Sequence, residues 1–177
     1  MISADDIRSL RGNQIDAEDT IALKARIAHI RLNREPFYLT AGEFQSILEW
    51  KLGQQLGRGR KLRVANTDEL IRAVTGFALT ISHSDPDYEI ELRIGALCLL
   101  RGVGVPVASA VLALAFPEKY AVIDFRAWRQ CFGVDQTVFW VNDYKRYMRE
   151  IQRLADELGW PPQEVDHAIW EYDRRKW

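Results

Sequence analysis

The chain has 177 residues, of which 47% are hydrophobic and 28% charged, and its formal net charge is −1. Two cysteines, Cys98 and Cys131, exclude a disulfide framework and predict reduced thiols. The longest apolar run, residues 103–116, is too short to span a membrane. The first residues lack the basic and apolar regions of a signal peptide, so we expect a cytoplasmic protein without a membrane segment.

Apolar spacing predicts helices in the first half of the chain. A helix over residues 16–32 is indicated by apolar residues at near-helical spacing, namely Ile21, Leu23, Ile27, Ile30 and Leu32. Thr40 and Glu43 have the spacing of a capping box, which predicts the start of a second helix. Its apolar stripe consists of Phe44, Ile47, Leu48 and Leu52. We expect this helix to end near the glycines of residues 57–59.

The second half of the chain is predicted to be helical as well. A capping box over residues 66–69 opens a helix whose expected apolar face comprises Leu70, Val74, Phe77, Ala78 and Ile81. Asp85 and Pro86 start the next helix, and residues 107–116 are apolar on nearly every side, as in a buried central helix. Further helices are predicted over residues 124–132, 137–158 and 161–177. With no strand pattern, the sequence predicts a single all-α domain, residues 1–177, of about eight helices.

A short glycine turn, residues 100–104, separates two of these helices. Gly102 and Gly104 flank Val103, and glycine allows one helix to end and another to begin within a few residues. The main-chain amides at the start of the second helix can hold a phosphate group. The alternative is a tight helix–helix turn without a ligand.

The glycine turn and the residues after it resemble a known family. Leu100, Gly102, Val103 and Gly104, then an alanine-rich helix with Ala108, and then Ile123-Asp124 and Arg129 follow the pattern of the helix-hairpin-helix DNA glycosylases. This superfamily includes endonuclease III and the adenine glycosylases. The resemblance covers about thirty residues, 100–129. It implies a helix-hairpin-helix DNA glycosylase-like helical bundle that binds duplex DNA and serves DNA repair by base excision.

Two departures from the family pattern narrow the expected chemistry. Pro106 stands where bifunctional glycosylases keep their Schiff-base lysine, so lyase chemistry by that route is closed. Two cysteines are too few for the four-cysteine iron–sulfur cluster of many relatives, and the three histidines show no metal-ligand spacing. The resemblance therefore implies a monofunctional DNA glycosylase, a hydrolase without AP-lyase activity, with neither cofactor nor metal.

Asp124 is the candidate catalytic residue. Cleavage of an N-glycosidic bond builds positive charge on the sugar, which a nearby carboxylate stabilises while it helps to activate water. A carboxylate is also favoured at a helix start because of the helix dipole. Aspartate is moreover a preferred N-cap residue, so capping alone would explain Asp124, and the two roles are compatible.

The candidate DNA contacts come from three places. The turn residues Gly102, Val103, Gly104 and Val105 would bind a phosphate through their main chain, without reading sequence. A basic run, residues 51–63, holds five basic residues and no acidic one; Arg58, Arg60 and Lys61 are its candidate phosphate contacts, and a solvated loop is the alternative. Arg126 and Arg129 share a helix face and would hold phosphates or form salt bridges.

A base pocket is expected from residues before the basic run. In glycosylases of the family, side chains from this part of the fold fill the gap that a flipped base leaves. Trp50, Lys51, Gln54 and Gln55 are the candidates. The competing interpretations are a core tryptophan, solvated glutamines and an ordinary exposed lysine.

Three functions remain open from the sequence. The first is a monofunctional DNA glycosylase, with Asp124 supporting attack at the sugar. The second is a non-catalytic DNA-binding module that uses the same glycine turn. The third is a protein–protein interaction domain, in which the apolar residues Val105, Pro106 and Val107 are buried against a partner. A fold resemblance cannot choose among them, because function depends on sites.

Overall fold

The computed structural model describes residues 1–10 and 16–176, which form α-helices, one 3₁₀-helix and no strand. The prediction of an all-α protein is therefore confirmed. Ten α-helices are present in these residues, two more than expected. The additional ones are short: α1 (Ala4–Arg8) and α4 (Arg60–Arg63). The predicted end of the last helix at Trp177 lies outside the described residues.

The remaining elements follow the predicted order. They are α2 (Glu18–Asn33), α3 (Ala41–Leu52), the 3₁₀-helix η1 (Gly53–Gly57), α5 (Asp68–Thr80), α6 (Pro86–Leu97), α7 (Val105–Ala115), α8 (Phe125–Phe132), α9 (Val141–Leu158) and α10 (Pro162–Lys176). The capping box of α3 is present: the side chains of Thr40 and Glu43 each accept a hydrogen bond from the backbone amide of the other residue. Gly133 and Gly159 end α8 and α9 in the left-handed conformation.

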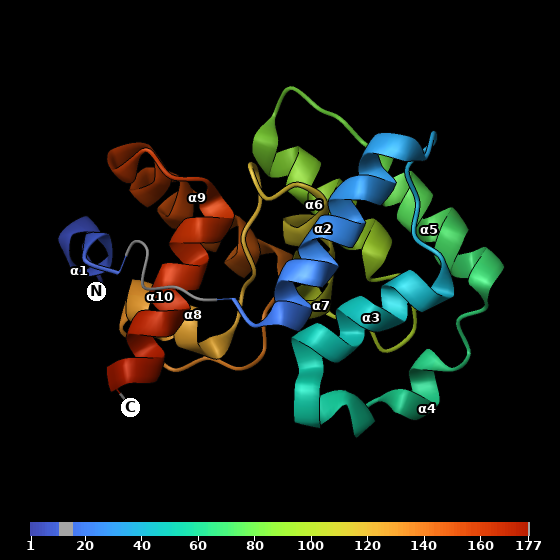
Figure 1. The fold of residues 1–177 in the computed structure, drawn as a ribbon, viewed down its shortest axis with the longest axis horizontal. Coiled ribbons are helices and arrows are strands. Elements are labelled where there is room, and N and C mark those ends of the chain that lie inside the picture. Colours follow the sequence, from blue (N-terminus) through green and yellow to red (C-terminus); the bar gives the residue numbers. More distant parts are fainter. Residues whose placement is uncertain (11–15, 177) are drawn as a thin grey trace.

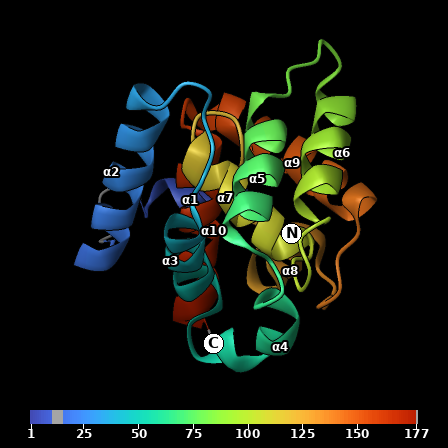
Figure 2. The same cartoon turned by 90° about the vertical axis from the view of Figure 1, so that its right-hand side faces the viewer.

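The core is built around α7. Every residue of this helix except Pro106 is buried, and α2, α3 and α6 pack against it. Figure 1 shows α1, α8, α9 and α10 gathered on one side of α7 and α3, α4 and α5 on the other, with α2 crossing in front of α7. Figure 2, turned by 90°, shows α5 and α6 lying side by side. The two groups of helices thus meet across a buried central helix.

Two predicted apolar faces differ from the observed ones. In α2, Leu23, Ile27 and Ile30 face the core, whereas Leu32 is 83% exposed. In α5, Phe77 is 62% exposed, and the buried residues include Ile71 and Thr75. Each helical residue advances by about 100°, so Leu32 falls on the side of α2 away from Ile27, and near-helical spacing alone does not place it on the buried face.

The glycine turn packs against α4. Gly102 has φ +71°, and a Cβ added there would lie 2.8 Å from Cγ of Arg63 and 3.2 Å from Cβ of Leu62. The side-chain amide of Asn66 reinforces the contact, because it accepts from the Arg101 amide and donates to the Arg101 carbonyl, both at 2.9 Å. The glycine turn therefore packs directly against the end of the basic run.

Gly102→Ala should destabilise the protein. Both the left-handed backbone and the close approach of Arg63 oppose a side chain, so we expect the free energy of unfolding to fall by about 1–3 kcal/mol in chemical denaturation. Gly42→Ala is the matched control, because a Cβ there meets no described atom within 4 Å; it should change stability by less than about 1 kcal/mol. Equal effects of the two substitutions would contradict this account of the turn.

Candidate functional site

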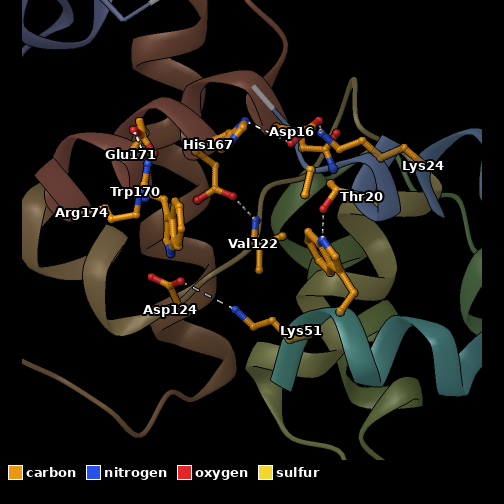
Figure 3. Close-up of a pocket in the computed structure, with 14 residues that line it drawn as sticks. Asp16, Thr20, Lys24, Lys51, Val122, Asp124, His167, Trp170, Glu171 and Arg174 are labelled. Atoms are coloured by element: carbon orange, nitrogen blue, oxygen red, sulfur yellow. Dashed lines mark hydrogen bonds and ion pairs between the residues drawn. The ribbon is translucent and has the colours of Figure 1, made fainter. Parts of the chain in front are cut away.

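A cavity of about 510 Å³ lies where the two groups of helices meet. Residues of α2 and α3 line one side and residues of α10 the other, and the segment between α7 and α8 lies between them (Figure 3). Its lining consists of Asp16, Ala17, Thr20, Lys24, Trp50, Lys51, Val122, Asp124, Gln163, Asp166, His167, Trp170, Glu171 and Arg174. The lining combines aromatic rings with acidic and basic groups.

Asp124 caps α8 and also faces the cavity. Its Oδ1 accepts the amides of Arg126 and Ala127, each at 2.9 Å. Its Oδ2 lies 3.9 Å from Nζ of Lys51, and the side chain remains 23% exposed. The capping role is thus confirmed, and one carboxylate oxygen is left to act in the cavity.

Lys51 projects from the last turn of α3 into the same place. Its side chain is 11% exposed, and Nζ donates to the carbonyl oxygen of Ile123 at 3.3 Å (Figure 3). Burial lowers the pKa of Lys51, while the negative charges of Asp124 and Asp166 oppose that shift. The expectation of an ordinary exposed lysine is therefore wrong: α3 delivers an amine to the wall of the cavity.

Asp166 is a second carboxylate in the cavity wall, carried by α10. It is buried; its Oδ1 accepts from the Tyr147 hydroxyl at 2.6 Å and its Oδ2 from the Val122 amide at 3.1 Å. Burial and the nearby charge of Asp124 raise the pKa of Asp166 to about 7, against the effect of those hydrogen bonds. This residue can therefore exchange a proton near neutral pH.

Asp166 is not among the site residues predicted from the sequence, although a signal for it exists. Asp166 and Asp173 are seven residues apart on α10, and both fall on the face that buries Val165 and Ile169. Aspartates on an apolar helix face are unusual unless they have partners, and both of these have them.

The segment that leads to Asp124 is fixed by buried hydrogen bonds. The Ile123 amide donates to Oγ of Ser109 at 3.1 Å, and the Tyr144 hydroxyl donates to the carbonyl of Ala121 at 2.9 Å. Ser109 lies four residues after Val105, the first residue of α7, or about 6 Å along the helix axis. Ser109 therefore ties the segment that carries Asp124 close to the end of α7 that follows the glycine turn.

Two tryptophans come from opposite sides of the cavity. Trp50 is carried by α3 and donates its Nε1 to Oγ1 of Thr20 at 3.2 Å. Trp170 is carried by α10 and lies beside the guanidinium of Arg174, 5.7 Å from the ring centre. Of the four candidate base-pocket residues, the structure brings Trp50 and Lys51 to the cavity. Gln54 and Gln55 are exposed in η1 and are not among the described residues that line the cavity.

Arg126 and Arg129 point to the buried carboxylate of Asp173. Arg126 donates to it at 3.0 Å, and Arg129 donates twice through Nη2 at 2.8 Å. Gln130 adds a bond at 2.7 Å. The salt-bridge alternative is thus realised, and a phosphate contact by these arginines remains a prediction.

The candidate phosphate contacts of the basic run lie at the surface. Arg58, Arg60 and Lys61 are exposed, whereas Arg63 donates to the carbonyls of Arg58 and Leu56 and so folds the run onto itself. Because the glycine turn packs on α4, the main-chain and side-chain candidates for phosphate binding adjoin each other. That they bind DNA remains a prediction.

Comparison with known proteins adds no assignment. The sequence matches no protein-family model, and neither a curated protein nor a solved structure matches the chain. Among residues 1–10 and 16–176, no helix has both the length and the apolar character needed to cross a membrane. No three His, Cys, Asp or Glu side chains in this part of the chain are grouped as metal ligands would be.

Proposed function

We propose that this protein is a DNA glycosylase of helix-hairpin-helix type, which removes a base from duplex DNA by cleaving its N-glycosidic bond. The observation that carries the proposal is the cavity in which the Asp124 carboxylate and the Lys51 amine lie 3.9 Å apart, with tryptophans on either side. Its volume of about 510 Å³ is within the range of small-molecule sites and leaves room for an extruded nucleotide.

The arrangement suits a reaction that develops positive charge on a sugar. As the bond from C1′ to the base weakens, the sugar takes on oxocarbenium character, and a fixed carboxylate nearby lowers the energy of that state. Hydrogen bonds from two backbone amides hold Asp124 in place before the substrate arrives, so little reorganisation accompanies the reaction. Trp50 and Trp170 offer flat apolar surfaces on which a base can stack.

The glycine turn and the basic run suit the DNA backbone. The glycine turn offers main-chain amides at the start of α7, and the adjoining basic run offers Arg58, Arg60 and Lys61. Both are phosphate-binding features without sequence preference, as base excision requires. The resemblance of residues 100–129 to the glycosylase family supports the same assignment.

A panel of duplexes, each with one defined damaged or mispaired base, tests the proposal. Purified protein is incubated with each duplex, and the free base is measured by chromatography. We expect release of base from at least one substrate. Salt-sensitive binding of duplex DNA without release from any member of the panel would instead favour the non-catalytic DNA-binding module.

Substitutions in the basic run should weaken binding to all duplexes alike. Arg58→Gln, Arg60→Gln and Lys61→Gln each remove one exposed cation, so each should lower the slope of log affinity against log salt by about 0.9 if it contacts a phosphate. Fluorescence anisotropy at a series of salt concentrations measures this slope. Arg153→Gln, on the exposed face of α9 where Arg153 pairs with Glu150 and Glu157, is the control. An unchanged slope in all three variants would exclude this surface as the DNA contact.

A further inference from the structure

We propose that His167 is a proton-sensitive latch at the edge of the cavity where α10 meets the start of α2. While its ring is neutral, α10 stays close to α2; when the ring is protonated, the two helices part and the cavity opens at this edge. The inference goes beyond base excision, because it concerns access to the cavity whatever molecule enters it. It rests on three polar side chains that line the cavity, namely Asp16, Lys24 and His167.

Asp16 stands between a cation and a titratable ring. Its Oδ2 pairs with Nζ of Lys24 at 2.6 Å, and its Oδ1 lies 3.6 Å from Nδ1 of His167 (Figure 3). The second distance is too long for a hydrogen bond. Because Lys24 already balances the charge of Asp16, a proton on His167 would leave a net positive charge at this edge.

The contact joins two parts of the molecule that pack against different neighbours. The helix α2 packs against α3 and α7, whereas α10 packs against α1, α8 and α9. Lys24 lies on α2 and Asp16 two residues before it, while His167 lies on α10. A change of charge on the ring therefore acts on the spacing between the two helices.

The ring is poorly placed to carry a charge in this arrangement. The side chain of His167 is 26% exposed, and burial lowers its pKa, as does the positive charge of Lys24. The negative charges of Asp16 and Glu171 oppose this shift, but Glu171, on α10, is itself paired with two arginines. Protonation of His167 is therefore unfavourable while α10 and α2 stay close.

The direction of the response follows from linkage. A hydrated histidine has a pKa of about 6.5, so the parted form, in which water reaches the ring of His167, has the higher pKa. Acid therefore shifts the equilibrium towards the parted form. If the pKa is lower by one in the closed form, the ratio of open to closed molecules rises by up to about tenfold. We expect that rise as the pH falls below about 6.5.

Titration of the three histidines by NMR tests the balance of charges at this edge. We expect His167 to have a pKa below about 6.5. Lys24→Gln should raise this pKa, because it removes a nearby cation, and Asp16→Asn should lower it. Lys145→Gln, in an ion pair with Glu91 outside the cavity lining, is the control and should leave the pKa unchanged. A pKa of His167 that responds to neither of the first two substitutions would contradict the latch.

A distance measurement between spin labels tests the movement itself. Ala25→Cys on α2 and Glu164→Cys on α10 place labels at exposed positions, and Cys98→Ser removes the partly exposed native thiol. Double electron–electron resonance compares the label distances at about pH 8 and about pH 5.5, on either side of the ordinary histidine pKa. We expect a population with a longer distance at the lower pH. Adding His167→Gln should give the closed distance at both pH values.

The controls separate the latch from other titrating groups. His29→Gln removes an exposed histidine of α2 outside the cavity lining, and it should leave the response intact. Asp166, with a pKa of about 7, also titrates near neutral pH. A response that persisted in the His167→Gln variant would belong to such a group and overturn the latch, and so would equal distances at both pH values. Neither result bears on base release, so the proposed function stands or falls separately.

Discussion

Asp124→Asn should lower the rate of base release by about 10²–10⁴-fold, because the variant loses the charge that stabilises the sugar cation. Single-turnover kinetics on the best substrate of the panel measure this rate. Asparagine caps helices about as well as aspartate, so the Asp124→Asn variant should retain the two hydrogen bonds from backbone amides. Its stability should fall by no more than about 1 kcal/mol. The substitution therefore separates catalysis from capping at one position.

Asp85 provides the matched control for Asp124. It caps α6 in the same manner, with its carboxylate accepting the amides of Asp87 and Tyr88, but it lies outside the cavity lining. Asp85→Asn should therefore change stability as little as Asp124→Asn does and leave base release unchanged. If Asp124→Asn also retained the full rate, Asp124 would be a cap and nothing more.

The second large effect is expected at Asp173. This buried carboxylate accepts from Arg126, Arg129 and Gln130 and so joins α10 to α8. Asp173→Asn removes the buried counter-charge that two guanidinium groups share, and we expect the free energy of unfolding to fall by about 2–4 kcal/mol. The arginines are partly exposed, which keeps the loss below that of a wholly buried pair.

The acid limb of the stability curve should report the same contact. Burial acts to raise the pKa of Asp173, but hydrogen bonds from Gln130, Arg129 and Arg126 outweigh it and lower the pKa. A carboxyl whose pKa is lower in the folded state stabilises the protein above its unfolded pKa of about 4 and loses that contribution as the pH falls further. The wild type should therefore lose more stability than the Asp173→Asn variant below about pH 4.

Asp135→Asn is the control for Asp173→Asn, because both aspartates pair with Arg129. Asp135 is 81% exposed and its Oδ1 lies 3.7 Å from Arg129, so its loss should change the free energy of unfolding by less than about 0.5 kcal/mol. Chemical denaturation of both variants checks the contrast. Equal, small losses would show that the contact between Asp173 and the two arginines contributes little to the stability of the fold.

Local signals in the sequence were sufficient for most of the fold. The capping box at Thr40 and the Asp85-Pro86 start each specify a helix end through contacts within a few residues, and both were predicted. The short helices α1 and α4 were missed because four or five residues carry too little periodicity to stand out. Exposed faces of α2 and α5 were misassigned because apolar residues such as Leu32 also occur at the surface.

The site was predictable only in part, since its members come from distant parts of the chain. Asp124 stood out locally, whereas Lys51 was only one of four base-pocket candidates, and the pairing of the two depends on how α3 packs beside the segment before α8. The environment of Lys51, enclosed and facing a carboxylate, is a tertiary property that residue spacing does not encode. For the same reason the link between Arg129 and Asp173, 44 residues apart, could not be foreseen.

The most direct test of the account is a crystal structure of the protein with a duplex that contains a stable, uncleavable abasic analogue. We predict that the analogue is turned out of the duplex and that its C1′ position lies in contact with Nζ of Lys51 and the carboxylate of Asp124, with the flanking phosphates at the glycine turn. A duplex bound elsewhere, with that nucleotide still stacked and the cavity empty, would contradict the account.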